Sequence, residues 1–202
     1  MRENKLDRAV ALLARGCELG DQHSCSRQAF YLVKDSHAEA DVAKAIQLWT
    51  AACDANDALG CTNLGSFYSD GEGVPQDPEK SALYFDKGCA LDDGFACGML
   101  ALDYGRGTGV TKDPAKATLL AQKGCNGGSA VACTAWGVAL EEGWAGAVDK
   151  VRAADLYRRA CENDDGAGCA RLAALTTDPA EAAKLRTKAC SRGITDACPP
   201  RQ

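Results

Sequence analysis

Cysteines along the chain are followed by apolar and small residues at helical spacing. Counted from the cysteine, a large apolar residue stands at position 3, a small one at position 4 and another large apolar one at position 7. Examples are Leu64, Gly65 and Tyr68 after Cys61, and Leu100, Ala101 and Tyr104 after Cys97. Positions 0, 3, 4 and 7 share one face of a helix. The pattern predicts one helix at each place, termed the A helix of a unit, with a small residue that lets a neighbouring helix approach closely.

A turn and a second helix, the B helix, are predicted after each A helix. The turn is clearest in "SDGEGVPQDPEK" and "GRGTGVTKDPAK", whose glycines supply the positive φ values that end a helix. Asp77 and Asp113, each followed by proline, are predicted N-caps, and Asp41 and Asp149 hold the same place without the proline. Paired apolar residues follow in the B helices: Leu48/Trp49, Tyr84/Phe85, Leu119/Leu120 and Leu156/Tyr157.

The cysteines occur in pairs with one spacing and an almost fixed period. They stand at 17 and 25, 53 and 61, 89 and 97, 125 and 133, 161 and 169, and 190 and 198, so successive pairs start 36 residues apart four times and then 29. A period of this length is typical of stacked repeats. We therefore predict an all-α solenoid of antiparallel helix pairs that spans residues 1–202 as one domain. The seven residues between paired cysteines are predicted to form the loop between two units.

Two units and both ends of the sequence depart from this pattern. The first connection, "KDSHAEAD", has no glycine, and the last, "TTDPAEAAK", drops the glycine turn. Arg8-Ala9 match Lys44-Ala45, so the chain is expected to begin inside a B helix, which fits a trimmed start. Pro199 and Pro200 are expected to stop the last helix almost where it begins.

Composition narrows the classes of function and the compartment. The net charge is -5, and 23 Lys+Arg are scattered among 28 Asp+Glu, which argues against a nucleic-acid partner. No apolar run approaches a membrane span, and the first residues lack the apolar core of a signal peptide. Twelve cysteines in 202 residues favour an oxidising compartment. We expect a periplasmic or secreted protein whose signal peptide has been trimmed.

The unit "C-x-x-L-G-x-x-Y-x-x-G-x-G-V-x-x-D-x-x-K-A" resembles the Sel-one-like repeat, a relative of the tetratricopeptide repeat. The match is best over residues 61–80 and 97–116. The C-x7-C at each junction resembles the Helicobacter cysteine-rich protein branch. This resemblance implies a right-handed α/α superhelix in a disulfide-stapled, exported protein that serves as an adaptor for other proteins or peptides. It also implies, for some members, penicillin binding or weak β-lactamase activity on a β-lactam or peptidoglycan-like ligand.

The paired cysteines suit a structural staple better than a reactive or metal site. Zinc sites favour closer ligand pairs with further Cys or His, and thiol oxidoreductases favour C-x-x-C beside a βαβ unit. The end of one helix and the start of its antiparallel neighbour can bring two Cα atoms within the roughly 4.4–6.8 Å of a disulfide. Small buried thiols in a cytosolic solenoid remain the alternative. The predicted disulfides are Cys17–Cys25, Cys53–Cys61, Cys89–Cys97, Cys125–Cys133, Cys161–Cys169 and Cys190–Cys198.

No catalytic motif is found in the sequence. The S-x-x-K, S-D-N and K-T-G set of serine β-lactamases is missing, as are G-x-S-x-G and HExxH. His23 and His37 are expected to be solvated loop residues, and the aromatic side chains at helical core spacing are expected to be packing residues. We therefore predict no catalytic residue, no metal and no cofactor. Hydrolase activity remains an alternative that rests on the resemblance alone.

A binding surface is predicted on the concave wall lined by the A helices, on the face opposite to the packed one. Its positions are 2, 6 and 9 after the cysteine. They are occupied by Arg27, Tyr31, Lys34, Asn63, Phe67, Asp70, Met99, Asp103, Arg106, Glu142 and Arg171. Apolar side chains flanked by charges of both signs suit an extended peptide or a protein segment. The main hypothesis is a monomeric, non-enzymatic scaffold, and the alternative for this surface is a set of ordinary solvated side chains.

Overall fold

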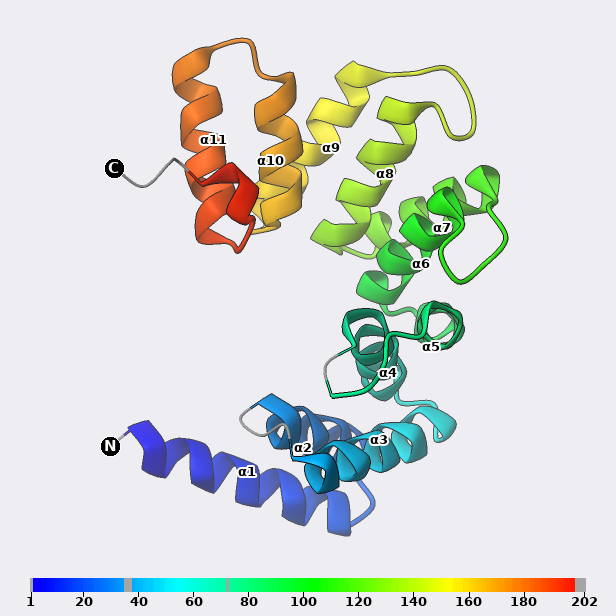
Figure 1. Ribbon diagram of the computed structural model, residues 1–202, viewed down its shortest axis with the longest axis vertical. Helices are drawn as coiled ribbons and strands as arrows, with labels where there is room; N and C mark the ends of the chain where they lie inside the picture. The colour runs from blue at the N-terminus through cyan, green and yellow to red at the C-terminus, as the bar shows by residue number, and fades with distance from the viewer. Residues whose placement is uncertain (1, 35–37, 72, 199–202) are drawn as a thin grey trace. The chain divides into compact units, whose positions relative to one another are not determined.

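The computed structural model describes residues 2–34, 38–71 and 73–198, with side chains from Arg8 onward (Figure 1). Within these ranges every regular element is helical: eleven α-helices and one short 3-10 helix. The chain packs as two compact units, Met1–Asp93 and Gly94–Gln202, and each is described by itself. The predicted all-α class is therefore confirmed.

In the first unit, B and A helices alternate as the sequence predicts. The B helices are α1 (Arg2–Glu18), α3 (Glu39–Asp54) and α5 (Pro78–Ala90), and the A helices are α2 (Gln22–Lys34) and α4 (Ala58–Asp70). Every helix packs against the next one in the chain, and the two A helices also pack against each other. The core between α2, α3 and α4 contains the buried side chains of Ala29, Val33, Val42, Trp49, Leu64 and Phe67.

The second unit continues the same alternation. Its A helices are α6 (Gly94–Arg106), α8 (Ala130–Glu142) and α10 (Gly166–Leu175), and its B helices are α7 (Pro114–Asn126), α9 (Lys150–Glu162) and α11 (Pro179–Ser191), followed by the 3-10 helix η1 (Thr195–Ala197). Successive A helices pack side by side, α6 on α8 and α8 on α10. Tyr157 of α9 is fully buried and forms a core with Val138 of α8 and Leu172 of α10.

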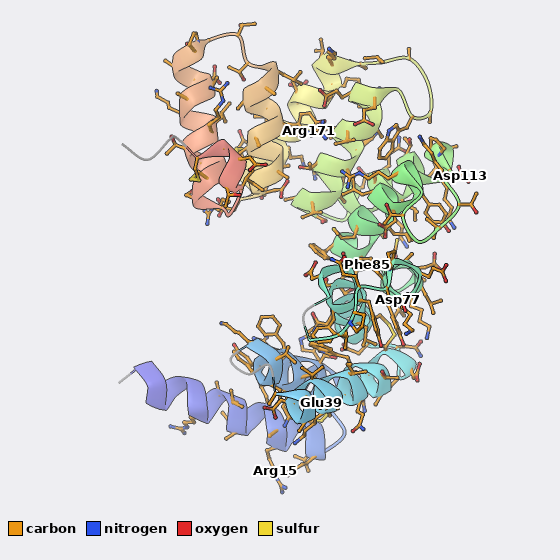
Figure 2. All side chains as sticks on the ribbon, in the orientation of Figure 1. Arg15, Glu39, Asp77, Phe85, Asp113 and Arg171 are labelled. Atoms are coloured by element: carbon orange, nitrogen blue, oxygen red, sulfur yellow. A yellow bond between two sulfur atoms is a disulfide. The ribbon has the colours of Figure 1, made fainter. Side chains whose placement is uncertain are left out.

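Aspartate N-caps begin the B helices where the sequence places them. Asp77 accepts a hydrogen bond of 3.0 Å from the backbone N–H of Lys80, and Asp113 accepts one of 2.9 Å from Lys116 (Figure 2). Asp149 makes the same contact without a following proline. Such caps satisfy backbone donors that have no partner within the helix.

The corresponding prediction for Asp41 is wrong. The N-cap of α3 is Ala38, and the helix begins at Glu39, so Asp41 lies inside its first turn. The connection before α3 lacks the glycines of the other turns, and the helix starts three residues earlier relative to the repeat. Acidic side chains in the first turn still favour the helix by their interaction with its dipole.

The small residue at position 4 of an A helix faces an aromatic ring of the B helix that follows it in the same repeat. A Cβ atom on Gly65 would lie 2.5 Å from the ring of Phe85, and one on Gly137 would overlap the ring of Tyr157. Both rings are buried. The predicted close approach is thereby confirmed, and the approaching group is an aromatic side chain of the paired helix.

Disulfides staple the junctions, with Cα–Cα distances of 4.5 to 4.8 Å in Cys17–Cys25, Cys53–Cys61, Cys125–Cys133, Cys161–Cys169 and Cys190–Cys198. The other two cysteines are disulfide-bonded as well, so none of the twelve, all described, is free. The loop is shorter than predicted. Between α3 and α4 it comprises residues 55–57 alone, because Cys53 and Cys61 both lie inside the helices.

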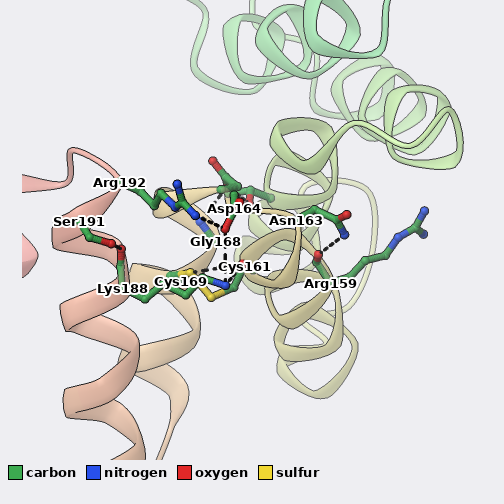
Figure 3. Close-up of a disulfide and its surroundings, with 11 residues drawn as sticks. Arg159, Cys161, Asn163, Asp164, Gly168, Cys169, Lys188, Ser191 and Arg192 are labelled. Atoms are coloured by element: carbon green, nitrogen blue, oxygen red, sulfur yellow. Dashed lines mark hydrogen bonds and ion pairs between the residues drawn. A yellow bond between two sulfur atoms is a disulfide. The ribbon is translucent and has the colours of Figure 1, made fainter.

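Cationic side chains contact the preceding junction at two places in the second unit, and Figure 3 shows the one at Cys161, where Lys188 binds. Lys188 donates a hydrogen bond of 2.6 Å to the backbone carbonyl of Cys161, and Arg159 donates one of 3.1 Å to that of Cys125. Both carbonyls belong to the last turn of a B helix, where carbonyl groups lack partners within the helix and the dipole favours positive charge. At these two junctions, the basic residue two positions before the first cysteine of a pair therefore links one repeat to the preceding one.

Candidate functional site

Two adjoining pockets form a groove along the A helices of the first unit. The larger, of about 420 Å³, is lined by His23, Arg27, Phe30 and Tyr31 of α2 and by Leu59 and Asn63 of α4. The smaller, of about 200 Å³, is lined by Phe30, Val33, Trp49, Asn63, Ser66, Phe67 and Asp70. Because Phe30 and Asn63 line both pockets, we treat the two as one surface, the α2/α4 groove.

The side chains of this groove come together because of helical periodicity. Arg27 and Phe30 of the groove and Lys34 beyond it are spaced three and four positions apart on α2, so they lie in one row on its surface. Asn63 faces them from α4, which packs against α2. Leu59 lies in the first turn of α4, one turn before Asn63. The groove therefore has one wall from each A helix.

Aromatic side chains form the apolar part of the groove. The rings of Phe30 and Tyr31 meet edge to face with their centroids 5.6 Å apart, and 46% of Phe30 is exposed. The Nζ atom of Lys34 lies 6.0 Å from the centroid of Phe30 and 5.8 Å from that of Tyr31. An ammonium group at such distances stabilises the exposed rings by a cation–π interaction.

Some polar side chains in or beside the groove are already hydrogen-bonded within the protein, and others are not. Asp57 caps α4 by accepting from the backbone N–H of Gly60, and it also accepts from the hydroxyl of Ser26 at 2.5 Å. Its other oxygen lies 3.4 Å from Nδ1 of His23. By contrast, the side chains of Arg27 and Asn63 have no hydrogen-bond or ion-pair partner among the described residues. These two groups are therefore available to a ligand.

The prediction that Phe67 faces solvent is wrong. Phe67 is only 6% exposed, and its ring centroid lies 5.3 Å from that of Trp49 on α3. Position 6 of α4 thus turns toward the preceding B helix, and Phe67 forms part of the floor of the groove. Asp70, one turn further, is exposed at the end of the same groove.

The structure also corrects and extends the expected lining of the groove. His23, predicted in a loop, lies in the first turn of α2 and is exposed, while His37 lies outside the described residues. Sequence reasoning missed Phe30 and Leu59. Phe30 could have been found from its spacing, since it stands three positions after Arg27 and four before Lys34, whereas Leu59 carries no such signal.

The predicted surface residues of the second unit are not gathered in its two described pockets, which other residues line. Arg106 is exposed, and Met99 is partly buried. Glu142 accepts a hydrogen bond of 2.9 Å from Nε1 of Trp144. Arg171 is paired with Glu141 at 3.2 Å. For these residues, binding remains a prediction from the sequence.

Arg171 belongs to a polar cluster with a structural role. The hydroxyl of Tyr157 donates a hydrogen bond of 2.7 Å to Glu141, which also accepts from Arg171. Burial, and then the hydrogen bond to Glu141, raise the pKa of the Tyr157 hydroxyl above its ordinary range. The neutral hydroxyl thus remains a donor at every physiological pH, and Arg171 is already engaged.

Asp103 of α6 makes stability depend on pH. Its Oδ2 atom is buried without a hydrogen-bond partner among the described residues. Burial raises the pKa of the carboxyl to about 6, although the positive charge of Arg106 acts to lower it. The folded chain therefore binds more protons than the unfolded one between about pH 4 and pH 6, so stability falls as the pH rises through this window. We expect Asp103→Asn to abolish this fall and to raise the urea midpoint at neutral pH.

The check is a series of urea unfolding curves across that pH range. Glu162→Gln, which changes an exposed carboxylate of the same unit, serves as the control and should leave the pH profile of the parent protein unchanged. A wild-type profile that is flat between pH 4 and pH 6 would contradict the role given to Asp103.

The described part of the chain contains no group of three or more His, Cys, Asp or Glu side chains placed to hold a metal ion. Among the described helices, none combines the length and the hydropathy needed to cross a bilayer.

Comparison with known proteins gives a family match and several structural likenesses. The Sel1 repeat profile matches residues 3–21, 35–57, 58–93, 94–129 and 130–165. Cysteine-rich protein B of Helicobacter pylori is 31% identical with a TM-score of 0.50, over 66% of this chain and 96% of that one. A Sel1 repeat protein from Oxalobacter formigenes is 23% identical with a TM-score of 0.71, over 89% of this chain and 76% of that one.

A protective antigen of uropathogenic Escherichia coli, which displays the same repeat fold, is 24% identical with a TM-score of 0.70 over 93% of this chain. The chain spans 42% of the length of that antigen. A comparison with curated proteins finds no match. The likenesses to the Oxalobacter and Escherichia proteins show the fold.

Proposed function

The chain belongs to the Sel1 repeat family, whose repeats are generally protein-interaction modules, and on this premise we propose that it is a non-enzymatic scaffold that binds an extended segment of another protein in the α2/α4 groove. The single observation that carries the proposal is the groove itself, where the free polar side chains of Arg27 and Asn63 border the exposed ring of Phe30. A repeat fold by itself supports many functions, so the proposal rests on this site.

The chemistry of the groove suits a peptide backbone. The Asn63 side-chain amide can both donate and accept hydrogen bonds, as the backbone of an extended segment requires. Phe30, Tyr31 and Leu59 offer an apolar recess beside it that can take one large side chain of the segment. The pocket volume of about 420 Å³ lies within the range of sites that hold small ligands.

The disulfides bear on where such a partner is met. Cross-links at every junction, together with the likeness to the Helicobacter cysteine-rich protein, suggest an oxidising compartment outside the cytoplasm. We propose that the scaffold acts in the periplasm or outside the cell. Penicillin binding and β-lactam hydrolysis remain expectations from the resemblance, and no feature of the described residues favours them.

The proposal is tested by selecting binders from a library of random peptides and mapping where they bind. We expect Asn63→Ala to weaken the selected peptides about 5-fold, because one hydrogen bond contributes on the order of 1 kcal/mol. Affinities are measured by fluorescence anisotropy on the oxidised protein.

Lys44→Ala is the matched control, since Lys44 is exposed on α3 and lines neither pocket of the groove. It should leave the affinities unchanged. Peptides that bind Asn63→Ala as tightly as the parent protein, or a selection that yields no binder, would refute binding in this groove.

A further inference from the structure

We propose that the segment bound in the α2/α4 groove is acidic, with two carboxylates flanking one large apolar side chain. This inference rests on the proposed function and adds the chemical class of the partner. It follows from the positive charges along α2, from the aromatic side chains between them and from the contacts that already engage the nearby carboxylates.

Two cations border the aromatic part of the groove. Arg27 and Lys34 are both exposed, and neither forms an ion pair with a described residue. Seven positions separate them, so they lie about 10 Å apart along the helix at 1.5 Å per residue. Phe30 and Tyr31 stand between them, and both contact Lys34. Along this face of α2, an aromatic recess therefore lies between two cations.

Among the described residues, the carboxylates near this row do not neutralise it. Asp57, at the same end as Arg27, is engaged by Ser26, the Gly60 N–H and His23, and its side chain is only 13% exposed. Asp21, which precedes α2, accepts a hydrogen bond from Ser24. Asp70 lies in the smaller pocket, beyond Phe30 and Asn63. The row along α2, from Arg27 beside the larger pocket to Lys34, therefore carries positive charge on a chain whose net charge is -5.

The spacing of the cations sets the spacing of the acidic groups. A segment in the extended polyproline II conformation has three residues per turn and rises about 3.1 Å per residue, so carboxylates three positions apart lie on the same side of it, about 9 Å apart. The side chain between them that points to the protein enters the recess formed by Phe30, Tyr31 and Leu59. Asn63, on the opposite wall, faces the backbone of the segment. The fitting sequence is an acidic residue, two residues that include a leucine or an aromatic one, and a second acidic residue.

The test compares three synthetic peptides that differ only in charge. One has the core Asp-Ala-Leu-Asp, the second has Asn in place of both acidic residues, and the third has Lys. We expect the acidic peptide to bind about 3- to 10-fold more tightly than the Asn peptide, as two partly exposed ion pairs allow. This preference should shrink at high salt, because screening weakens exposed charge pairs.

Charge reversal gives the decisive comparison. In the double variant Arg27→Glu/Lys34→Glu the preference should switch to the Lys peptide, whereas Lys44→Glu on α3 should keep the preference of the parent protein. Both sites are exposed, and thermal unfolding of each variant checks that the fold is retained. Equal binding of the acidic and Asn peptides overturns the acidic inference.

The outcomes separate the two proposals. If peptides selected from the random library depend on Asn63 but show no preference for acidic residues, the groove binds a segment and the charge inference fails. If no selected peptide depends on Asn63, the proposed function fails first. A preference for the Lys peptide in the parent protein would also refute the acidic partner.

Discussion

Replacing Cys125 and Cys133 together with alanine lowers the free energy of unfolding by about 2–3 kcal/mol, the loss expected for opening a loop of this length in the unfolded chain. The disulfide joins positions eight apart at the junction of α7 and α8, and both cysteines are buried. Each repeat contacts only its neighbours in a stacked array, so a junction inside the second unit supports helices on both sides. Urea unfolding followed by circular dichroism measures the change.

The matched control is the double replacement of Cys190 and Cys198. This disulfide has an exposed member and joins α11 to the short helix η1. Its loss should release η1 and leave the main urea transition almost in place. An equal shift of the main transition in both variants would show that the stabilisation by a disulfide does not depend on where its junction lies in the unit.

Replacing Trp49 with alanine is expected to lower the free energy of unfolding by about 3–5 kcal/mol, because it opens a large cavity in the first unit. Trp49 is 2% exposed, packs against Phe67 and donates a hydrogen bond of 2.9 Å from Nε1 to the backbone carbonyl of Ser26. The variant removes the packing and the hydrogen bond together. Thermal and urea unfolding of the oxidised protein provide the measurement.

Trp49→Phe separates the two contributions. It keeps a ring against Phe67 and loses the hydrogen bond to Ser26, so a loss of about 1–2 kcal/mol is expected. If the two variants are equally destabilised, the hydrogen bond rather than the packing dominates at this position.

The features that the sequence predicts well depend on contacts between residues close in the chain. The Asp77 and Asp113 caps act within one turn of their own helix, and a disulfide such as Cys53–Cys61 joins cysteines eight positions apart. Their geometry follows from spacing alone. The A and B helices could therefore be placed from the repeat pattern without knowledge of the packing.

The features that the sequence misses depend on packing between helices. Phe67 is buried because α4 turns position 6 toward Trp49 of α3, and an isolated helix does not reveal that orientation. Arg171 meets Glu141 from a position 30 residues away. Asp41 is displaced because the connection before α3 differs from the repeat. Binding at the predicted A-helix residues therefore stays a prediction, while the burial of Phe67 and the exposed ring of Phe30 needed the structure.

The consecutive pairing of the cysteines has a consequence for biosynthesis. In the five disulfides described above with their distances, each bond joins a cysteine to the next one in the sequence. A nascent chain that enters an oxidising compartment from its N-terminus exposes the two members of a pair one after the other, before the next pair has arrived. Oxidation in that order yields the native bonds directly, so maturation needs an oxidase but little help from a disulfide isomerase.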